Sequence, residues 1–197
     1  MRISKEAAVD NKARVLEVAK RLLREKGFSG LGVAEVMKEA GFTHGGFYNH
    51  FGSKENLAVE AVQSAFDEAV SRVAAKAAEA RNPRRRREAF RHYVDRYLSI
   101  KTRDAPGRAC PMAALGTDAA RHGQALKAPF AKGVERYLEA FAGVVPNTDG
   151  HSSTRQTAIV IISTLIGALT LSRACAGASN ELSEEILSVV HNQLLKG

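Results

Sequence analysis

Apolar residues recur along most of the chain at the three- and four-residue spacing that places them on one face of an α-helix. In the first such stretch, residues 10–25, this stripe includes Val15, Leu22 and Leu23. Proline is scarce, with 5 in 197 residues, while alanine, leucine and arginine abound, a composition that favours helix over sheet. The sequence therefore predicts an all-α protein of about nine helices with a real core.

Glycine, proline and capping residues divide this pattern into elements. Gly27 is expected to end the first helix and Gly41 to follow a short second one. Ser53 can cap a long helix, and Pro83 suits the first turn of the next, whose apolar face is expected to extend to Ile100. The predicted helices cover residues 10–25, 33–40, 44–50, 54–79, 83–100, 111–123, 125–142, 154–176 and 182–195. We expect a domain over residues 1–53, with a helix-turn-helix at about 32–51, and a second domain over 54–197.

Two adjacent glycines, Gly45 and Gly46, lie inside the short third helix, where each costs about 1 kcal/mol relative to alanine. If this helix enters the major groove, residues without side chains let its backbone approach DNA closely. Phe47 and Phe51, four residues apart, would anchor the helix in the core. The side chains expected to contact phosphates and base edges are Thr43, His44, Tyr48, Asn49 and His50, with Asn49 the candidate for an adenine contact.

The run from Gly41 to Leu57 resembles the recognition-helix signature of TetR-type repressors at every fixed position: Gly, hydrophobic, Ser/Thr, x, Gly, x, hydrophobic, Tyr, x, His, Phe, x, Ser, Lys, Glu, x, Leu. The resemblance implies a transcriptional repressor that a small molecule releases from DNA. By the same resemblance, Thr43, His44 and Gly45 approach DNA, Tyr48 and His50 reach phosphates, and Lys54 neutralises a phosphate.

The chain departs from the family before the second helix. Leu31 and Gly32 stand where the family usually has Thr followed by Ser or Thr, so a hydroxyl contact to phosphate is in doubt there.

The resemblance also implies a ligand pocket among helices four to seven and a homodimer formed by the last two helices on a near-palindromic DNA operator. The pocket residues that we predict are Phe90, Tyr93, Tyr97, Cys110 and Met112. The dimer residues that we predict are Leu165, Leu169, Ile186, Val190 and Leu194. The effector is an unidentified small molecule.

Cys110 precedes Pro111, which suits the first position of a helix, so the cysteine is expected at the N-cap. There the helix dipole and nearby Arg108 would lower the pKa of the thiol. The segment is similar to one in which some TetR-type repressors carry an electrophile- or oxidant-sensing cysteine. We favour a small residue in the pocket wall, and a thiol-switched repressor is the alternative.

The net charge of +8 is weak support for DNA binding because of where it lies. Residues 1–60 carry 10 basic against 8 acidic side chains, whereas residues 81–108 carry 10 against 3. We interpret the arginine run Arg84–Arg87 as solvated surface, with flanking DNA or an anionic effector as alternatives.

Other classes of protein have little support in the sequence. Residues 1–10 lack the apolar stretch of a signal peptide, so we expect a cytoplasmic protein with Cys110 and Cys175 reduced. The apolar run 158–171 is too short for a membrane span and is expected to be a buried helix. We predict no cofactor and no metal, since the histidines and cysteines show no ligand spacing. No phosphate loop or nucleophile with a base is recognisable, so we predict no enzyme; an architectural DNA binder without an effector is a remote alternative.

Overall fold

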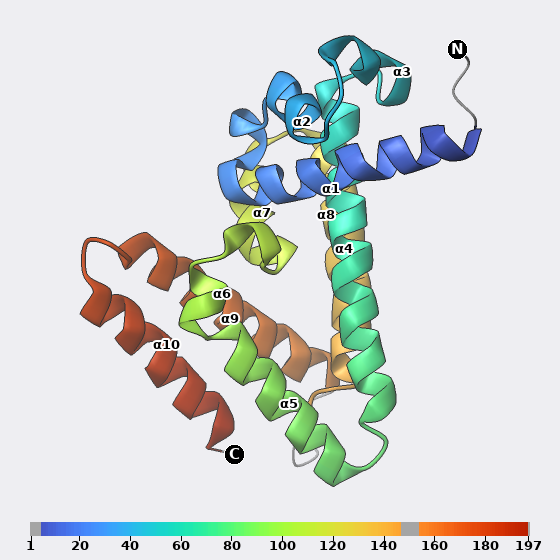
Figure 1. Cartoon of the computed structure of the whole chain (residues 1–197). Coiled ribbons are helices and arrows are strands. Elements are labelled where there is room, and N and C mark those ends of the chain that lie inside the picture. Colours follow the sequence, from blue (N-terminus) through green and yellow to red (C-terminus); the bar gives the residue numbers. More distant parts are fainter. Residues whose placement is uncertain (1–4, 147–153, 197) are drawn as a thin grey trace.

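The computed structural model describes residues 5–146 and 154–196, and within them the chain is all-α, as predicted. Figure 1 shows α1, α2 and α3 gathered at one end of the molecule, from which the long helix α4 runs to the opposite end, where α5 begins. The helices of the described ranges are α1 (Lys5–Gly30), α2 (Val33–Glu39), α3 (Phe47–His50), α4 (Lys54–Glu79), α5 (Pro83–Tyr97), α6 (Ile100–Arg103), α7 (Pro111–Arg121), α8 (Gln124–Ala142), α9 (Thr154–Cys175) and α10 (Asn180–Leu195). Two 3-10 turns, His44–Gly46 and Pro106–Arg108, precede α3 and α7.

The small end is built on the apolar face of α1. Val15, Leu22 and Leu23 are buried there, in one core with Phe47 of α3 and Leu57 of α4. Burial of such side chains contributes about 1.5–3 kcal/mol each relative to exposure. This core fixes the position of α3 relative to α1 and α4.

Gly27 interrupts α1, where the sequence predicted the end of the helix. Its φ of 70° is one that glycine adopts without strain, and one further helical turn follows as far as Gly30. A side chain at this position would overlap the carboxylate of Asp118 in α7. That carboxylate accepts a hydrogen bond of 3.2 Å from the backbone N–H of Phe28, so α7 is joined directly to the end of α1.

The second region is held by the close crossing of α4 and α8. Gly133 of α8 lies under the ring of Phe66, and a Cβ at Gly133 would overlap that ring. The remaining helices pack beside this pair, and α9 and α10 are joined by buried Ser172 and Ser183, each of which donates from its hydroxyl to the other's carbonyl oxygen.

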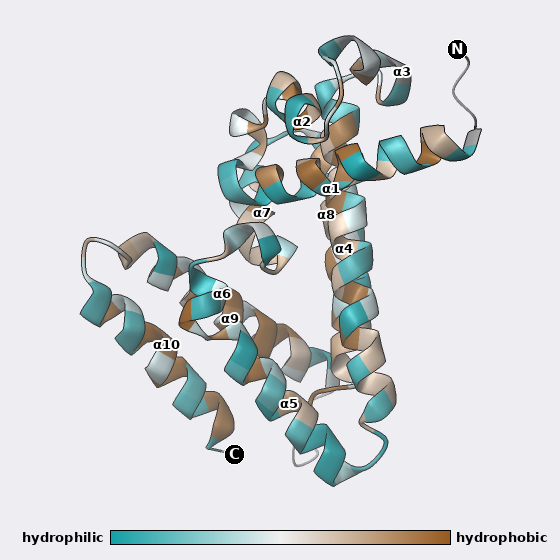
Figure 2. Cartoon of the chain, viewed as in Figure 1, coloured by the Kyte–Doolittle hydropathy of each residue, from teal (hydrophilic) through white to brown (hydrophobic). Residues whose placement is uncertain are grey.

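Helix α9 has one buried face and one exposed apolar face. It is long and apolar enough to cross a membrane by length and composition alone, a test that the core helix of a soluble protein also passes. Ala158, Ile162 and Leu165 are buried within the chain, whereas Val160 and Leu171 are 64% and 58% exposed. Figure 2 shows the hydrophobic colouring along this helix. The prediction of a buried helix therefore describes only one side of α9 in a single chain.

Two local predictions need correction. Helix α5 ends at Tyr97, and Ile100, expected on its apolar face, begins α6 and is 47% exposed. The separate helix forms because the Ser99 hydroxyl caps it, accepting from the backbone N–H of Thr102. Thr43 has the extended backbone of an N-cap, but its side chain makes no capping hydrogen bond, and the segment that it precedes begins as a 3-10 turn.

Candidate nucleic-acid interface and adjoining cavity

The segment from Gly41 to His50 is held to the small core by two phenylalanines. Phe47 and Phe51 are 1% and 4% exposed, and their rings stack with centroids 5.8 Å apart. Gly41 has a φ of 81°, which lets the chain reverse between α2 and the 3-10 turn. The arrangement is a helix-turn-helix whose second helix is a single turn of 3-10 followed by a single turn of α.

The opposite face of this segment is open to solvent and polar. Thr43, His44 and Tyr48 are exposed on it, and the His44 and Tyr48 rings meet edge to face with centroids 6.1 Å apart. His50 is half-buried beside Phe51. Hydroxyl, imidazole and phenol groups can all donate to phosphate oxygens, so this face suits a nucleic-acid backbone.

The glycines of this face are not required by the protein's own packing. A Cβ built at Gly45 would meet no atom within 4 Å, and one at Gly46 would make only an ordinary contact of 3.7 Å with Met37. Neither has a positive φ. The protein's own packing therefore does not require glycine at these two positions. Without side chains there, another molecule can come close to the backbone.

Three other predicted positions have different surroundings. The Lys54 ammonium lies 3.4 Å from the carbonyl oxygen of Ser29 and 4.9 Å from the centre of the Phe28 ring. In this structure the Lys54 side chain therefore contacts the end of α1. Leu31 is buried, and Gly32 precedes α2 without a side-chain cap, which leaves no hydroxyl at this point. The side chain of Asn49 lies outside what the structure describes.

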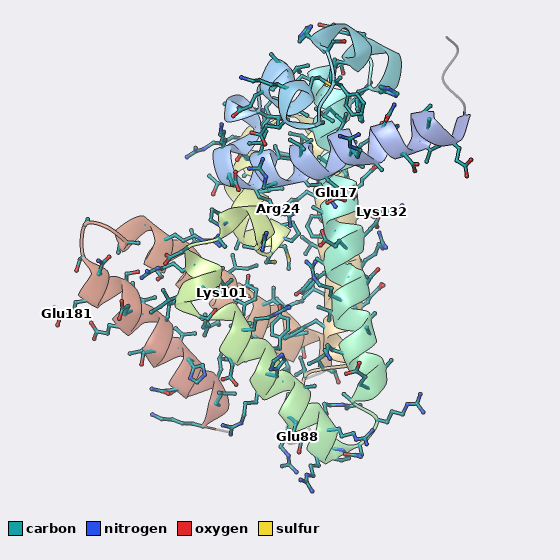
Figure 3. The ribbon with its side chains drawn as sticks, viewed as in Figure 1. Glu17, Arg24, Glu88, Lys101, Lys132 and Glu181 are labelled. Carbon is teal, nitrogen blue, oxygen red and sulfur yellow. The ribbon has the colours of Figure 1, made fainter. Side chains whose placement is uncertain are left out.

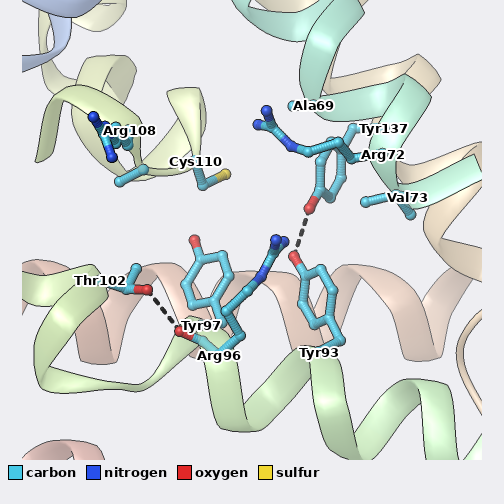
Figure 4. A pocket seen from close by; sticks show the side chains of 11 residues that line it. Ala69, Arg72, Val73, Tyr93, Arg96, Tyr97, Thr102, Arg108, Cys110 and Tyr137 are labelled. Atoms are coloured by element: carbon cyan, nitrogen blue, oxygen red, sulfur yellow. Dashed lines mark hydrogen bonds between the residues drawn. The ribbon is translucent and has the colours of Figure 1, made fainter. Parts of the chain in front are cut away.

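A cavity of about 200 Å³ lies below α1, between α4 and the loop that leads into α7 (Figure 4). The Tyr93 and Tyr137 hydroxyls are hydrogen-bonded across it at 2.5 Å. Tyr97 is 6% exposed, and its hydroxyl has no hydrogen-bond partner of ordinary geometry among the described residues. The lining residues are Ala69, Arg72, Val73, Tyr93, Arg96, Tyr97, Thr102, Arg108, Ala109, Cys110 and Tyr137.

An ionic cluster connects this cavity with α1. Arg72, in the cavity wall, pairs with Glu68, whose other oxygen lies 3.5 Å from the Lys20 ammonium and 3.9 Å from the Arg24 guanidinium. Burial raises the pKa of Glu68, but the charges of Arg72, Lys20 and Arg24 outweigh it, and the pKa is lower than usual. Arg24 also donates to the carbonyl oxygen of Ala109 at 3.2 Å, so α1 touches the cavity rim directly (Figure 3).

A family model matches the amino-terminal region of the chain. The model of the bacterial regulatory proteins of the tetR family matches residues 15–61, which contain α2, α3 and the first turns of α4. Over these residues the chain is similar to the tetR family.

Curated relatives match part of the chain. The chain is 43% identical over 54 residues to the HTH-type transcriptional regulator LmrA of Bacillus subtilis, which is 27% of this chain and 29% of LmrA. It is 31% identical over 72 residues to the uncharacterized HTH-type transcriptional regulator YfiR of the same organism, covering 36% and 35% of the two chains. The chain thus spans about a third of the curated relatives that it matches.

Solved structures share the fold over nearly the whole length. The reduced form of NemR from E. coli superimposes with a TM-score of 0.75 at 20% identity, covering 93% of this chain and 96% of NemR. A TetR regulator from Chloroflexus aurantiacus gives 0.76 at 20% identity, with 96% and 94% covered. At this identity the likeness establishes the fold of the second region and no ligand.

The predicted pocket residues fall in three places. Tyr93, Tyr97 and Cys110 line the cavity. Phe90 is buried in the core outside the cavity wall, and Met112 faces a separate apolar hollow of about 290 Å³ between α7, α8 and α9. Sequence reasoning missed Arg72, Arg96 and Tyr137 as lining residues, because nothing in the spacing of an arginine or tyrosine on an amphipathic helix shows which neighbouring helix it will face.

The prediction of a low pKa for Cys110 was wrong. Cys110 does hold the N-cap position of α7, with Pro111 in the first turn. However, burial raises the pKa of the thiol, and this outweighs the opposing effects of the Tyr97 hydroxyl and of the backbone amides of Met112 and Ala113. The sequence placed the thiol correctly at the helix terminus but did not reveal how far the surrounding helices remove it from water.

The predicted dimer residues also divide into two groups. Leu165 and Leu169 have no exposed surface in a single chain, so they cannot contact a second copy and that prediction is corrected. They point inward because their face of α9 packs within the chain's own core. Ile186, Val190 and Leu194 of α10 are half-buried and keep some free surface.

Proposed function

We propose that this chain is a transcriptional repressor that binds double-stranded DNA as a homodimer and is released by a small molecule bound in the cavity. DNA binding is supported by the face made by Thr43, His44, Gly45 and Tyr48. This face is exposed and polar, and the protein's own packing does not require its glycines. We assign DNA binding to residues 1–53 and ligand binding with dimerisation to residues 54–197.

A dimer is proposed because α9 and α10 leave apolar surface uncovered. Val160, Leu171, Leu182 and Val189 are exposed large hydrophobic residues on these two helices. Gly167, between Val160 and Leu171 in α9, has nothing near its Cβ position, so a second helix can approach closely there. We call Gly41–His50 the recognition segment. Pairing the exposed faces of α9 and α10 about a twofold axis would place the two recognition segments of a dimer about one DNA turn, roughly 34 Å, apart.

Reversible ligand binding is favoured over the thiol switch by the surroundings of Cys110. A sensing cysteine reacts as the thiolate, and burial keeps this thiol protonated. The cavity, in contrast, is already formed and touches α1 through Arg24 and Ala109. A ligand that binds the DNA-competent and DNA-incompetent forms with different affinity would shift the balance between them.

Gel-shift titration on the intergenic DNA upstream of the chain's own gene tests DNA binding. Tyr48→Ala and Lys54→Ala are expected to weaken binding about tenfold each, since each removes a phosphate contact, and Lys54→Ala should also reduce the salt dependence because it removes a positive charge. Lys132→Ala, an exposed lysine on α8, is the matched control and should bind as the parent does. Binding that is independent of salt, or unchanged in both test variants, would contradict the proposal.

Sedimentation of the purified protein tests the dimer. Val160→Glu combined with Leu171→Glu should give a monomer that is still folded by circular dichroism, because both side chains are exposed in the single chain. Val9→Glu, on α1 and 68% exposed, serves as the control that should leave the dimer intact. A parent protein that sediments as a monomer at micromolar concentration would rule the arrangement out.

A further inference from the structure

The cavity is lined by three arginines and by no carboxylate. Arg72 is paired with Glu68, which lies outside the lining, whereas Arg96 and Arg108 form no ion pair with a described residue. Figure 4 shows the Arg96 side chain rising between the Tyr93 and Tyr97 rings toward the cavity. Guanidinium groups hold carboxylates through paired N–H donors, so the cavity carries donors for an anion that the protein itself does not supply.

Tyr97 gives a second and independent indication of a ligand. Its hydroxyl is buried without a partner of ordinary geometry among the described residues, next to the Cys110 thiol, and Figure 4 shows it pointing into the open space. Burial raises the pKa of this phenol well above its usual range, so it remains a donor at neutral pH. Since buried polar groups are nearly always hydrogen-bonded, this hydroxyl is placed to donate to a bound oxygen.

The rest of the cavity wall is suited to a ligand with a flat aromatic or short aliphatic group. The Tyr93 and Tyr97 rings lie with centroids 5.7 Å apart and 30° between their planes, and Ala69 and Val73 of α4 face them. A volume of about 200 Å³ is smaller than the pockets of roughly 300–1,000 Å³ that hold drug-sized molecules. The ligand is therefore small.

We propose that the cavity binds a small organic monocarboxylate, with its carboxylate between Arg96 and Arg108, in reach of the Tyr97 hydroxyl, and its aromatic or short aliphatic body among the tyrosines. This inference rests on the proposed function for its regulatory meaning, but binding itself does not require it.

The ionic cluster provides the connection to DNA binding. A carboxylate in the cavity competes with Glu68 for Arg72. Glu68 also lies 3.5 Å from Lys20, which pairs more closely with Glu17 at 2.5 Å, and 3.9 Å from Arg24 of α1. Lys20 and Arg24 are 3% and 8% exposed, so a change in their partner changes the packing of α1 on α4. Occupancy of the cavity thereby alters the helix on which the recognition segment is packed.

Calorimetric titration of the purified full chain tests the ligand class. The probes are benzoate and hexanoate, each with its uncharged amide as the matched control, at constant ionic strength. At least one acid should bind tenfold or more tightly than its amide. Arg96→Gln and Arg108→Gln should each weaken that binding about tenfold, because each removes a charge-assisted hydrogen bond. Arg91→Gln, on the same helix but outside the cavity wall, should not.

Two outcomes would overturn the proposal. One is that neither acid binds more tightly than its amide. The other is that the binding is insensitive to both Arg96→Gln and Arg108→Gln in variants whose circular dichroism matches the parent. Arg96→Lys, which keeps the charge, should recover part of the affinity and separates a lost ion contact from a misfolded wall.

Gel shifts with and without the bound acid test the connection to α1. The acid should weaken operator binding in the parent, and Glu68→Gln should keep acid binding while losing most of that effect. An acid that binds without changing operator affinity would contradict the connection through Arg72. If no operator is bound under any condition while the acid still binds, the repressor proposal fails and the ligand class stands; the reverse result removes the ligand class alone.

Discussion

The recognition segment and the cavity present polar groups in opposite ways. In the segment, Phe47 and Phe51 turn inward and the polar side chains face water. In the cavity, the buried Tyr97 and the partly solvent-exposed Arg96 line a space between several helices. The first arrangement suits the surface of a large, rigid polymer, which must be approached from outside. The second suits a small ligand that can be surrounded, and the difference shows how one all-helical chain can separate two kinds of binding.

The largest effect is expected from breaking the anchor of the recognition segment. Phe47→Ala should lower the free energy of unfolding of the small end by about 3–5 kcal/mol, because a fully buried ring is replaced by a cavity. Operator binding should be lost while binding of a small acid persists. Denaturant unfolding and titration of the same preparation measure both. Tyr48→Ala, at an exposed neighbour, should lose operator affinity without this loss of stability; equal destabilisation by the two variants would contradict the anchoring role.

Gly45 offers a sharper test of the same surface. Gly45→Ala adds a methyl group that meets no atom of the protein and should raise the free energy of unfolding by up to about 1 kcal/mol. Operator affinity should nevertheless fall about tenfold, or about 1.4 kcal/mol, if the backbone approaches DNA at this point. Gly116→Ala in α7, where the new methyl group would also be accommodated, is the control that should leave operator binding unchanged. Parallel changes of stability and affinity in Gly45→Ala would remove the argument for close approach.

The reactivity of Cys110 tests the enclosed character of the cavity. At pH 7 its alkylation by iodoacetamide should be several-fold slower than that of free cysteine, because burial raises the pKa of the thiol. A Cys175→Ser background isolates the signal. Labelling as fast as free cysteine, or faster, would restore the thiol switch as the mode of control.

The smallest effect concerns the ion cluster between cavity and α1. The pKa of Glu68 is depressed in the folded chain, so its contribution to stability is present above the unfolded value of about 4.3 and is lost as the pH falls through the folded value. Because this side chain is 43% exposed, solvent reduces the contribution to about 1 kcal/mol or less. The difference in free energy of unfolding between the parent and Glu68→Gln should therefore shrink between pH 6 and pH 3. A difference that grows on acidification would show that the carboxylate is not stabilised by its arginine and lysine neighbours.

How far the sequence could predict each region depended on how its residues are distributed along the chain. The caps at Ser53 and Pro83 and the turn at Gly41 act on neighbours within a few residues, and the structure confirms all three. The short α6 was missed because its capping residue, Ser99, looked like part of a continuing helix. Leu165 and Leu169 were assigned to the wrong face, since a helix that is apolar on most sides carries no periodic signal to tell the chain's own core from a partner.

Most of the helices, their main breaks and the segment from Gly41 to His50 could be predicted from sequence, because each depends on residues that are close together in the chain. The cavity between α4, α5 and α8 depends on how distant segments pack together. Arg72, Arg96, Cys110 and Tyr137 come from four separate segments. Their packing buries the thiol, brings arginines from different helices to one cavity and leaves the Tyr97 hydroxyl without a partner of ordinary geometry among the described residues. Burial and charge are properties of that packing, so the paired glycines could be interpreted from the sequence, but the chemistry of the cavity could not.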